Sequence, residues 1–119
     1  MASLLDANAI LRFLLNDIPD QAKKSAEVIF TGAITREVVI AEVVYVLEGN
    51  YKCSHSEIAY KLEKLLELVA VENTEVVRYA LRVFGETSLD FVDCLLIGYN
   101  HIAGCEIFSF DKKLNNRLK

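Results

Sequence analysis

The chain has few cysteines, the residues that stabilise many small proteins through disulfide bonds or bind their metal ions. It contains three cysteines among 119 residues, and no two of them are spaced as Cys-x-x-Cys. An odd number without that spacing argues against both a disulfide framework and a zinc site. Cys94 and Cys105 lie in apolar contexts, where a free thiol usually behaves as a small hydrophobic group. We therefore expect the cysteines to be structural.

Long apolar runs, linkers and repeats are also missing. No apolar run reaches the roughly 18 residues that indicate a membrane span, and the N-terminus lacks the basic start and cleavage site of a secretory signal. Proline occurs only once. Hydrophobic residues make up 53% and charged residues 25%, as in soluble globular proteins. The sequence predicts one domain over residues 1–119, with no membrane partner and a cytoplasmic location.

Positive charge is in short supply. The formal net charge is −4, from 13 basic and 17 acidic residues. Dedicated nucleic-acid binders are usually basic, so the chain does not grip phosphates by bulk charge. A nuclease is still compatible with this balance, because bound cations and local basic patches can hold its substrate. One such patch, Lys112, Lys113, Arg117 and Lys119, follows Asp111; it is either a substrate contact or a solvated helix end.

Several common catalytic motifs are absent as well. The chain has no Ser/His/Asp arrangement, no glycine-rich phosphate loop and no His-Glu-x-x-His. Its two histidines, His55 and His101, are far in sequence from the acidic residues that stand out. These acidic residues occur singly inside apolar segments, where an unpaired carboxylate is costly to bury. The four segments are Leu4-Leu5-Asp6, Ile40-Ala41-Glu42-Val43-Val44, Leu89-Asp90-Phe91-Val92-Asp93-Cys94-Leu95 and Phe108-Ser109-Phe110-Asp111.

Hydrophobic periodicity predicts strands that alternate with helices. The strands are expected at residues 2–5, 33–34, 68–71 and 106–110. Helices are expected at 7–16, at 36–48 after a cap at Thr35, at 74–84 and at 90–103. Asp20 is expected to cap a further helix that runs through Phe30. One more helix follows the capping box Ser54-His55-Ser56-Glu57, and a short basic one follows Asp111. Valines in 36–48 favour a strand, but the length and the terminal Gly49 favour a helix. The alternation predicts an α/β fold, a parallel β-sheet flanked by helices in three layers.

This arrangement would bring the isolated carboxylates together. Asp6 and Asp111 each end a predicted strand, and ligands of open α/β sheets bind beyond the carboxyl ends of the strands. Asp90 and Asp93 are three residues apart at a helix start, hence on one face, where the helix dipole favours acidic side chains. Glu42 would face the same cleft from its own helix. Four elements are thus expected to deliver oxygen ligands to one place.

Oxygen ligands of this kind suit Mg²⁺ or Mn²⁺. One such ion, or a pair, can activate a water molecule and stabilise the leaving oxygen of a phosphodiester. Structural roles stay open for single residues, because Asp90 is also suited to be an N-cap and Asp6 and Asp111 can each cap the helix that follows. All of them being structural together is the weaker interpretation. The sequence therefore points to a metal-dependent enzyme that cuts phosphodiester bonds.

The same residues resemble a known family. Leu4-Leu5-Asp6-Ala7-Asn8 with Leu11-Arg12, Ala41-Glu42-Val43-Val44-Tyr45-Val46-Leu47, Asp90-Phe91-Val92-Asp93-Cys94-Leu95-Leu96-Ile97 and Phe108-Ser109-Phe110-Asp111 resemble the four motifs of PIN-domain ribonucleases. The likeness is greatest to the VapC-type toxins of toxin–antitoxin pairs. The motifs follow in order across the whole chain. Each motif alone is weak evidence, whereas the ordered set is specific.

The resemblance implies a single PIN-like domain with Mg²⁺- or Mn²⁺-dependent endoribonuclease activity. It also implies a homodimer and a small antitoxin protein whose segment blocks the cleft. Ala7 departs from the family, which often has a hydroxyl residue there. The implied roles are metal binding and catalysis for Asp6, Glu42, Asp93 and Asp111, an accessory carboxylate for Asp90, and orientation of ligands or water for Asn8 and Ser109. Apart from the resemblance, the basic residues Arg12, Lys112 and Lys113 are candidate contacts to the substrate.

Two other functional classes share features with this sequence. A phosphate-accepting receiver domain needs adjacent acidic residues after its first strand, a mid-chain aspartate and a lysine after its last strand. This chain has only Asp6 at the first place, no aspartate in residues 50–60, and Asp111 at the third. A non-catalytic PIN-fold module that binds RNA or protein is the second alternative, and the presence of all four acidic positions argues against it.

Overall fold

Three short parallel strands form the sheet of this protein. The computed structural model describes residues 2–119, and its strands are β1 (Ser3–Leu4), β2 (Ala33–Thr35) and β3 (Ala70–Val71). The sheet order is β1-β2-β3, so β2 is central and β1 and β3 are the edges. Leu4 pairs with Ile34, which in turn pairs with Ala70. The expected parallel α/β arrangement is confirmed.

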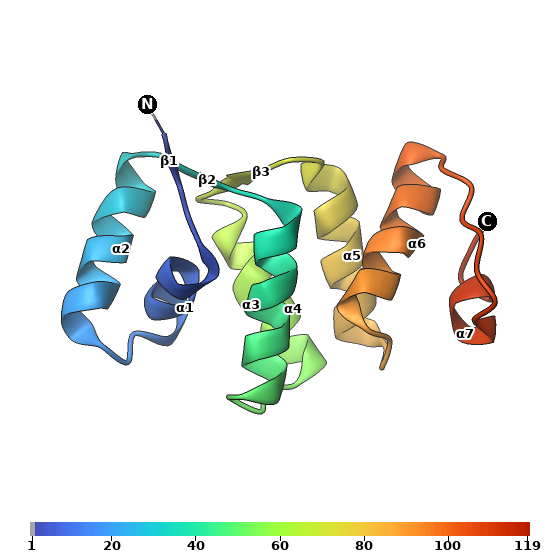
Figure 1. Ribbon diagram of the computed structural model, residues 1–119, viewed down its shortest axis with the longest axis horizontal. Helices are drawn as coiled ribbons and strands as arrows, with labels where there is room; N and C mark the ends of the chain where they lie inside the picture. Colours follow the sequence, from blue (N-terminus) through green and yellow to red (C-terminus); the bar gives the residue numbers. More distant parts are fainter. Residues whose placement is uncertain (1) are drawn as a thin grey trace.

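Among residues 2–119, seven helices flank this sheet. The molecule is a slab of 45 × 32 × 17 Å, in which α1 and α2 lie at one end and α6 and α7 at the other (Figure 1). Within residues 2–119, none of the helices is long and apolar enough to cross a membrane. The helices are α1 (Ala7–Leu15), α2 (Pro19–Thr31), α3 (Glu37–Gly49), α4 (His55–Leu65), α5 (Thr74–Glu86), α6 (Phe91–Ala103) and α7 (Lys112–Asn115).

Local sequence signals explain where several helices begin and end. The predicted capping box is present: the Ser54 hydroxyl accepts from the backbone N–H of Glu57, and the Glu57 carboxylate accepts from that of Ser54. The bonds from Ser54 lower the pKa of Glu57. Gly104 ends α6 with a positive φ of 73°, as expected of a helix C-terminus. The valine-rich segment is the helix α3, because its apolar face is buried in the core.

Two predicted helix caps are wrong. Helix α2 begins at Pro19 with Ile18 as its N-cap, so Asp20 lies inside the first turn. Helix α3 follows Arg36, and Thr35 is instead the buried last residue of β2. Its hydroxyl donates to the carbonyl oxygen of Leu5 (3.4 Å), which joins the ends of β2 and β1.

The predicted strand at residues 106–110 is also wrong. This segment has no sheet partner among residues 2–119, and it runs beside α6 towards α7 (Figure 1). Its phenylalanines, Phe108 and Phe110, are 87% and 91% exposed. The segment has the residue pattern of a strand. However, the chain after α6 packs against α6 itself, at the end of the slab away from β1 (Figure 1).

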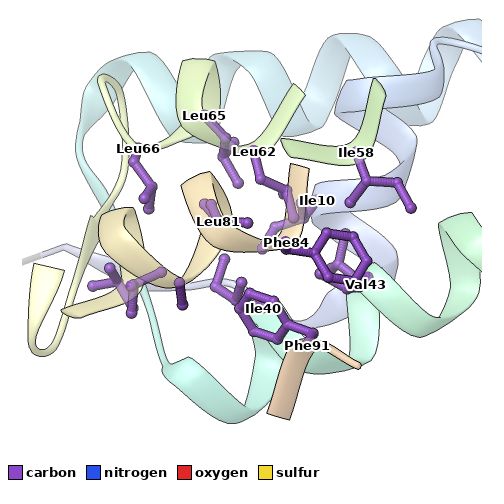
Figure 2. Close-up of a cluster of buried hydrophobic side chains, with 14 of the residues drawn as sticks. Ile10, Ile40, Val43, Ile58, Leu62, Leu65, Leu66, Leu81, Phe84 and Phe91 are labelled. Atoms are coloured by element: carbon purple, nitrogen blue, oxygen red, sulfur yellow. The ribbon is translucent and has the colours of Figure 1, made fainter. Parts of the chain in front are cut away.

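The hydrophobic core lies among the helices. Figure 2 shows Ile10 of α1, Ile40 of α3, Leu62 of α4 and Leu81 and Phe84 of α5 converging on one cluster. Burial of this kind is the main favourable term in folding. The cluster extends to the first turn of α6 and so fixes where that helix begins.

Neither histidine nor the buried cysteine is left for catalysis. His55 stacks on Phe84 with ring centroids 3.7 Å apart, and its Nε2 lies 2.8 Å from Glu48. His101 Nδ1 lies 3.0 Å from the Tyr79 hydroxyl. Burial raises the pKa of the Cys94 thiol to about 12, so it is un-ionised at neutral pH and unreactive.

Helices α5 and α6 approach closely at Gly98, and this contact yields a stability prediction. A Cβ at position 98 would lie 2.8 Å from the carbonyl oxygen of Val76, which belongs to the backbone of α5. We expect Gly98→Ala to lower the free energy of unfolding by about 1–3 kcal/mol, since the helices must separate. Denaturant unfolding measures this change. Gly49→Ala is the control, because a Cβ there meets nothing within 4 Å; equal effects would contradict the close packing.

Candidate carboxylate site

Acidic side chains gather where α6 begins. Asp90 is the N-cap residue of α6, although its side chain makes no capping hydrogen bond, and Asp93 lies one turn further on. Asp93 is partly buried. Its pKa is raised above the usual aspartate value, first by loss of solvent and then by the negative charges of Asp111 and Asp90. The three carboxylates therefore share one electrostatic neighbourhood.

Asp111 reaches this neighbourhood from the start of α7. Its Oδ1 accepts a hydrogen bond from the Leu114 backbone N–H (3.0 Å), so Asp111 caps α7 as the sequence allowed. Its own N–H donates to Ser109 Oγ (3.0 Å), which places Ser109 in direct support of Asp111. Lys112 and Lys113 follow as exposed residues. This capping bond uses only Oδ1 of Asp111; the second carboxylate oxygen takes no part in the cap.

Glu42 lies in a groove that adjoins the same helix start. The groove has a volume of about 530 Å³ and includes Val92, the residue before Asp93. Glu42 is exposed on α3 and lines this groove. The groove is lined by Val38, Ala41, Glu42, Tyr45, Val46, Asn50 and Val92.

Asp6 stands apart from these residues. It follows β1 and caps α1, its Oδ1 accepting from the Ala9 backbone N–H (2.8 Å). Asn8 is exposed in the first turn of the same helix. Figure 1 shows α1 and α7 towards opposite ends of the molecule, so Asp6 and Asp111 do not meet. The sheet-edge argument required residues 106–110 to be a strand next to β1, and that strand is absent.

Arg12 is occupied by contacts within the chain. Its guanidinium binds the Asp17 carboxylate (3.1 Å) and the Tyr51 hydroxyl (3.3 Å). The Arg12 side chain is only 11% exposed. These contacts fasten α1 to the loop before α2 and to the turn after α3. A contact between Arg12 and RNA stays a prediction.

The donor chemistry fits a hard divalent cation, but the arrangement is incomplete. Carboxylates are ligands that Mg²⁺ and Mn²⁺ prefer. A cation would offset the repulsion from Asp111 and Asp90, which adds to loss of solvent in raising the pKa of Asp93. However, within residues 2–119 no three acidic, histidine or cysteine side chains lie close enough to hold one ion. The metal-ligand roles of Asp6, Glu42, Asp93 and Asp111 stay predictions.

A polar cluster that the sequence did not reveal fixes α3 against α6. The Tyr99 hydroxyl donates to the Glu37 carboxylate (2.6 and 2.7 Å), and Asn73 Nδ2 donates to both Tyr99 Oη (3.1 Å) and Glu37 (3.0 Å). The bond to Glu37 raises the pKa of Tyr99. Glu72 also accepts from the Glu37 backbone N–H (2.8 Å). No local spacing signals this set, because its members come from three distant segments.

Comparison with protein families identifies the fold. The PIN domain family matches residues 3–117 of the chain. The chain belongs to the PIN-domain family. Its parallel sheet with flanking helices agrees with the PIN α/β/α fold, and the receiver-domain alternative is wrong. We found no match to this chain among curated proteins or among solved structures.

Membership bears on activity at a coarse level. PIN domains are in general nucleases that act on nucleic acid and use divalent metal ions. Asp90 and Asp93 belong to the third acidic motif of the sequence and Asp111 to the fourth, and the structure brings these two motifs close together. Family membership therefore supports a hydrolase activity for this PIN domain. It does not identify the substrate, the metal ion or the partners.

The raised pKa of Asp93 predicts a gain in stability when its charge is removed. A carboxyl with a higher pKa in the folded chain loses folded-state stability as pH rises through that pKa. We expect metal-free Asp93→Asn to have a higher free energy of unfolding than wild type at pH 7. The difference should shrink below a pH of about 4, where both states of wild type are protonated.

Denaturant unfolding in EDTA at the two pH values measures this difference. Glu27→Gln, on the exposed face of α2, is the control for a change of net charge. Destabilisation of Asp93→Asn at pH 7 would mean that the Asp93 carboxylate has a stabilising partner, contrary to the crowding by Asp90 and Asp111.

Proposed function

We propose that this PIN domain is an endoribonuclease that hydrolyses RNA phosphodiester bonds with Mg²⁺ or Mn²⁺. The observation that supports it is the position of the partly buried Asp93, whose pKa is raised first by loss of solvent and then by the negative charges of Asp111 and Asp90. Carboxylates that repel one another in the folded chain are typical of a site in which a bound cation neutralises their charge. Asp93, Asp111, Glu42 and Asp6 are the proposed metal ligands and catalytic carboxylates.

Each carboxylate has a defined task in this proposal. A bound divalent cation supplies Lewis acidity, which makes a water molecule nucleophilic at neutral pH. Asp93 and Asp111 hold the charge at the starts of α6 and α7, and Ser109 supports the backbone of Asp111. Asp90 adds negative potential without capping its helix. Asn8, exposed beside Asp6, is proposed to orient a ligand or water.

Substrate contacts are assigned to the basic residues next to the site. Lys112 and Lys113 are exposed and directly follow Asp111, so they lie where an RNA phosphate would approach. With a net charge of −4, the chain depends on such local contacts and on the cation. Arg12 is the third proposed contact, although it would have to share its guanidinium with Asp17.

The proposed biological role is that of the toxin in a VapC-type toxin–antitoxin pair, acting as a homodimer in the cytoplasm. The groove beside Glu42 supports a partner that blocks the site. Val38 and Tyr45 in this groove are apolar or aromatic and exposed. A segment of a small antitoxin protein lying there would cover Glu42 and exclude RNA.

Metal-dependent cleavage is the direct test of the activity. We expect wild type with Mg²⁺ or Mn²⁺ to cut total cellular RNA into discrete fragments, and EDTA to stop it. Asp6→Asn should reduce the rate by about 100-fold or more, since even losing a hydrogen-bond partner of a metal ligand costs roughly 10–100-fold. Asparagine still caps α1, so the fold should persist. Glu27→Gln should cleave normally, and cleavage that survives EDTA would contradict the metal requirement.

Asp90 is predicted to matter less than the four principal carboxylates. Asp90→Asn keeps the N-cap position and removes one charge from the neighbourhood of Asp93. We expect a loss of about 10-fold in cleavage rate, against a much larger loss for Asp93→Asn. Initial rates on one RNA with saturating metal measure both. Equal losses would make Asp90 a principal ligand.

A non-catalytic PIN module that binds RNA or protein is the second candidate function. It is favoured by the lack of three close ligands within residues 2–119. Wild type that binds RNA without cutting it, in the presence of either metal, would support this function over the nuclease.

A further inference from the structure

A small pocket lies between α7 and the loop that precedes α6. Its volume is about 260 Å³, and it is lined by Thr87, Ser88, Leu89, Lys113, Asn116 and Arg117. Two of these side chains are positively charged, and Ser88 and Asn116 add neutral groups that can donate hydrogen bonds. Among residues 2–119, no acidic residue lines this pocket. A concentration of donors without a carboxylate, in a chain of net charge −4, suits a bound anion.

The polar side chains around this pocket are free to bind a ligand. Within residues 2–119, the side chains of Ser88, Lys113, Asn116 and Arg117 make no hydrogen bond or ion pair with another residue. All four residues are exposed. Arg12, by contrast, is already bound to a carboxylate of its own chain. The pocket therefore offers donors that no group of the described chain satisfies.

Arg117 extends from a fixed backbone. Its N–H donates to the Leu114 carbonyl oxygen (2.9 Å), and its own carbonyl oxygen lies 2.7 Å from His101 Nε2. Burial raises the pKa of the Cys94 thiol, and the charge of Arg117 opposes this rise, which places the guanidinium near the first turn of α6. A binding group on a fixed backbone loses little conformational freedom when its ligand arrives.

The opposite wall of the pocket is fixed as well. Thr87 Oγ1 donates to the Val83 carbonyl oxygen (2.9 Å) and accepts from the Leu89 N–H (3.3 Å). Ser88 lies between these two anchored residues, and its hydroxyl takes no part in either bond. The pocket is thus formed before any ligand binds.

Both walls of the pocket lead into the carboxylate neighbourhood. Leu89 directly precedes Asp90, and Lys113 follows Asp111 by two residues. Asp90 and Asp111 are the two carboxylates whose charges act on Asp93. A cationic pocket therefore adjoins an anionic site. A phosphodiester chain suits this pair, because one phosphate can meet the carboxylates through a cation while the next binds the pocket directly.

We propose that this pocket binds a backbone phosphate of RNA, one nucleotide away from the phosphate that is cut. Arg117 binds two phosphate oxygens through its planar guanidinium, Lys113 adds a second positive charge, and Ser88 and Asn116 donate hydrogen bonds. Such contacts carry no information about the bases; they fix the register and orientation of the strand. The identity of the ligand as RNA rests on the proposed function, whereas binding in the pocket requires no metal.

RNA binding without metal tests the pocket. We expect Arg117→Gln to bind a single-stranded RNA oligonucleotide in EDTA about 10-fold more weakly than wild type, the cost of losing a hydrogen bond between charged groups. The steepness of log affinity against log salt concentration should fall by about 0.7, the value for one phosphate contact to a single strand. Arg117→Lys keeps the charge without the planar fork, so it should bind more weakly but retain the salt dependence. Fluorescence anisotropy of labelled RNA measures both quantities.

Lys24→Gln is the matched control, because it removes one positive charge from an exposed position on α2. It should change neither the affinity nor the salt dependence, and circular dichroism should show every variant folded. Equal binding by Arg117→Gln and Lys24→Gln, or wild type that binds no RNA, would overturn the proposed phosphate site. RNA with a phosphate on its 5′ end should bind no better than RNA without one. A preference for that end would overturn the assignment to a backbone phosphate.

Cleavage kinetics separate this pocket from the reacting phosphate. Arg117→Gln should raise KM about 10-fold and leave kcat within about twofold, because a contact made equally to the substrate and the transition state affects KM alone. A fall in kcat at unchanged KM would place Arg117 on the phosphate that is cut, and so would overturn the assignment to a neighbouring one. Wild type that binds RNA through Arg117 without cutting it would support the pocket and contradict only the nuclease.

Discussion

The side chain of Asn100 holds the C-terminal part of this protein in place. Through its two polar atoms it binds Cys105, where the tail leaves α6, and Lys119, where the chain ends. A buried amide must satisfy both its donor and its acceptor, and here the tail does so. The path of residues 105–119 along α6 therefore decides that the sheet has three strands and that Asp111 faces the start of α6.

The electrostatics of the site follow from that path. Asp111 approaches Asp93 and Asp90, and the Asp93 carboxyl is at the same time drawn out of water by the packing of α6. Both effects disfavour the charged form of Asp93, so keeping this carboxylate ionised costs free energy when no metal is bound. Glu42 joins from the adjoining groove, whereas Asp6 is tied to α1 as its cap. The site is therefore in two parts within one chain.

Much of the fold was predictable because its signals are local. The Ser54/Glu57 capping box, Gly104 after α6 and the apolar face of α3 each act within a few residues, and each appears where the pattern indicates. The parallel sheet follows from the alternation of strands and helices. The helix caps at Asp20 and Thr35 were wrong, because Pro19 is itself well suited to a first helical turn and Thr35 is needed to join β2 to Leu5.

The sequence by itself determined the α/β class, the PIN family through four ordered acidic motifs, and the residues that carry negative charge into apolar surroundings. These depend on residue type and on short spacings. Tertiary structure alone decided that residues 106–110 lie outside the sheet and that Tyr99 of α6 binds Glu37 of α3. It also decided that Asp93 lies near Asp111 and Asp90. Those outcomes depend on contacts between residues far apart in the chain, and no short pattern encodes which of two partners a strand or a carboxylate meets.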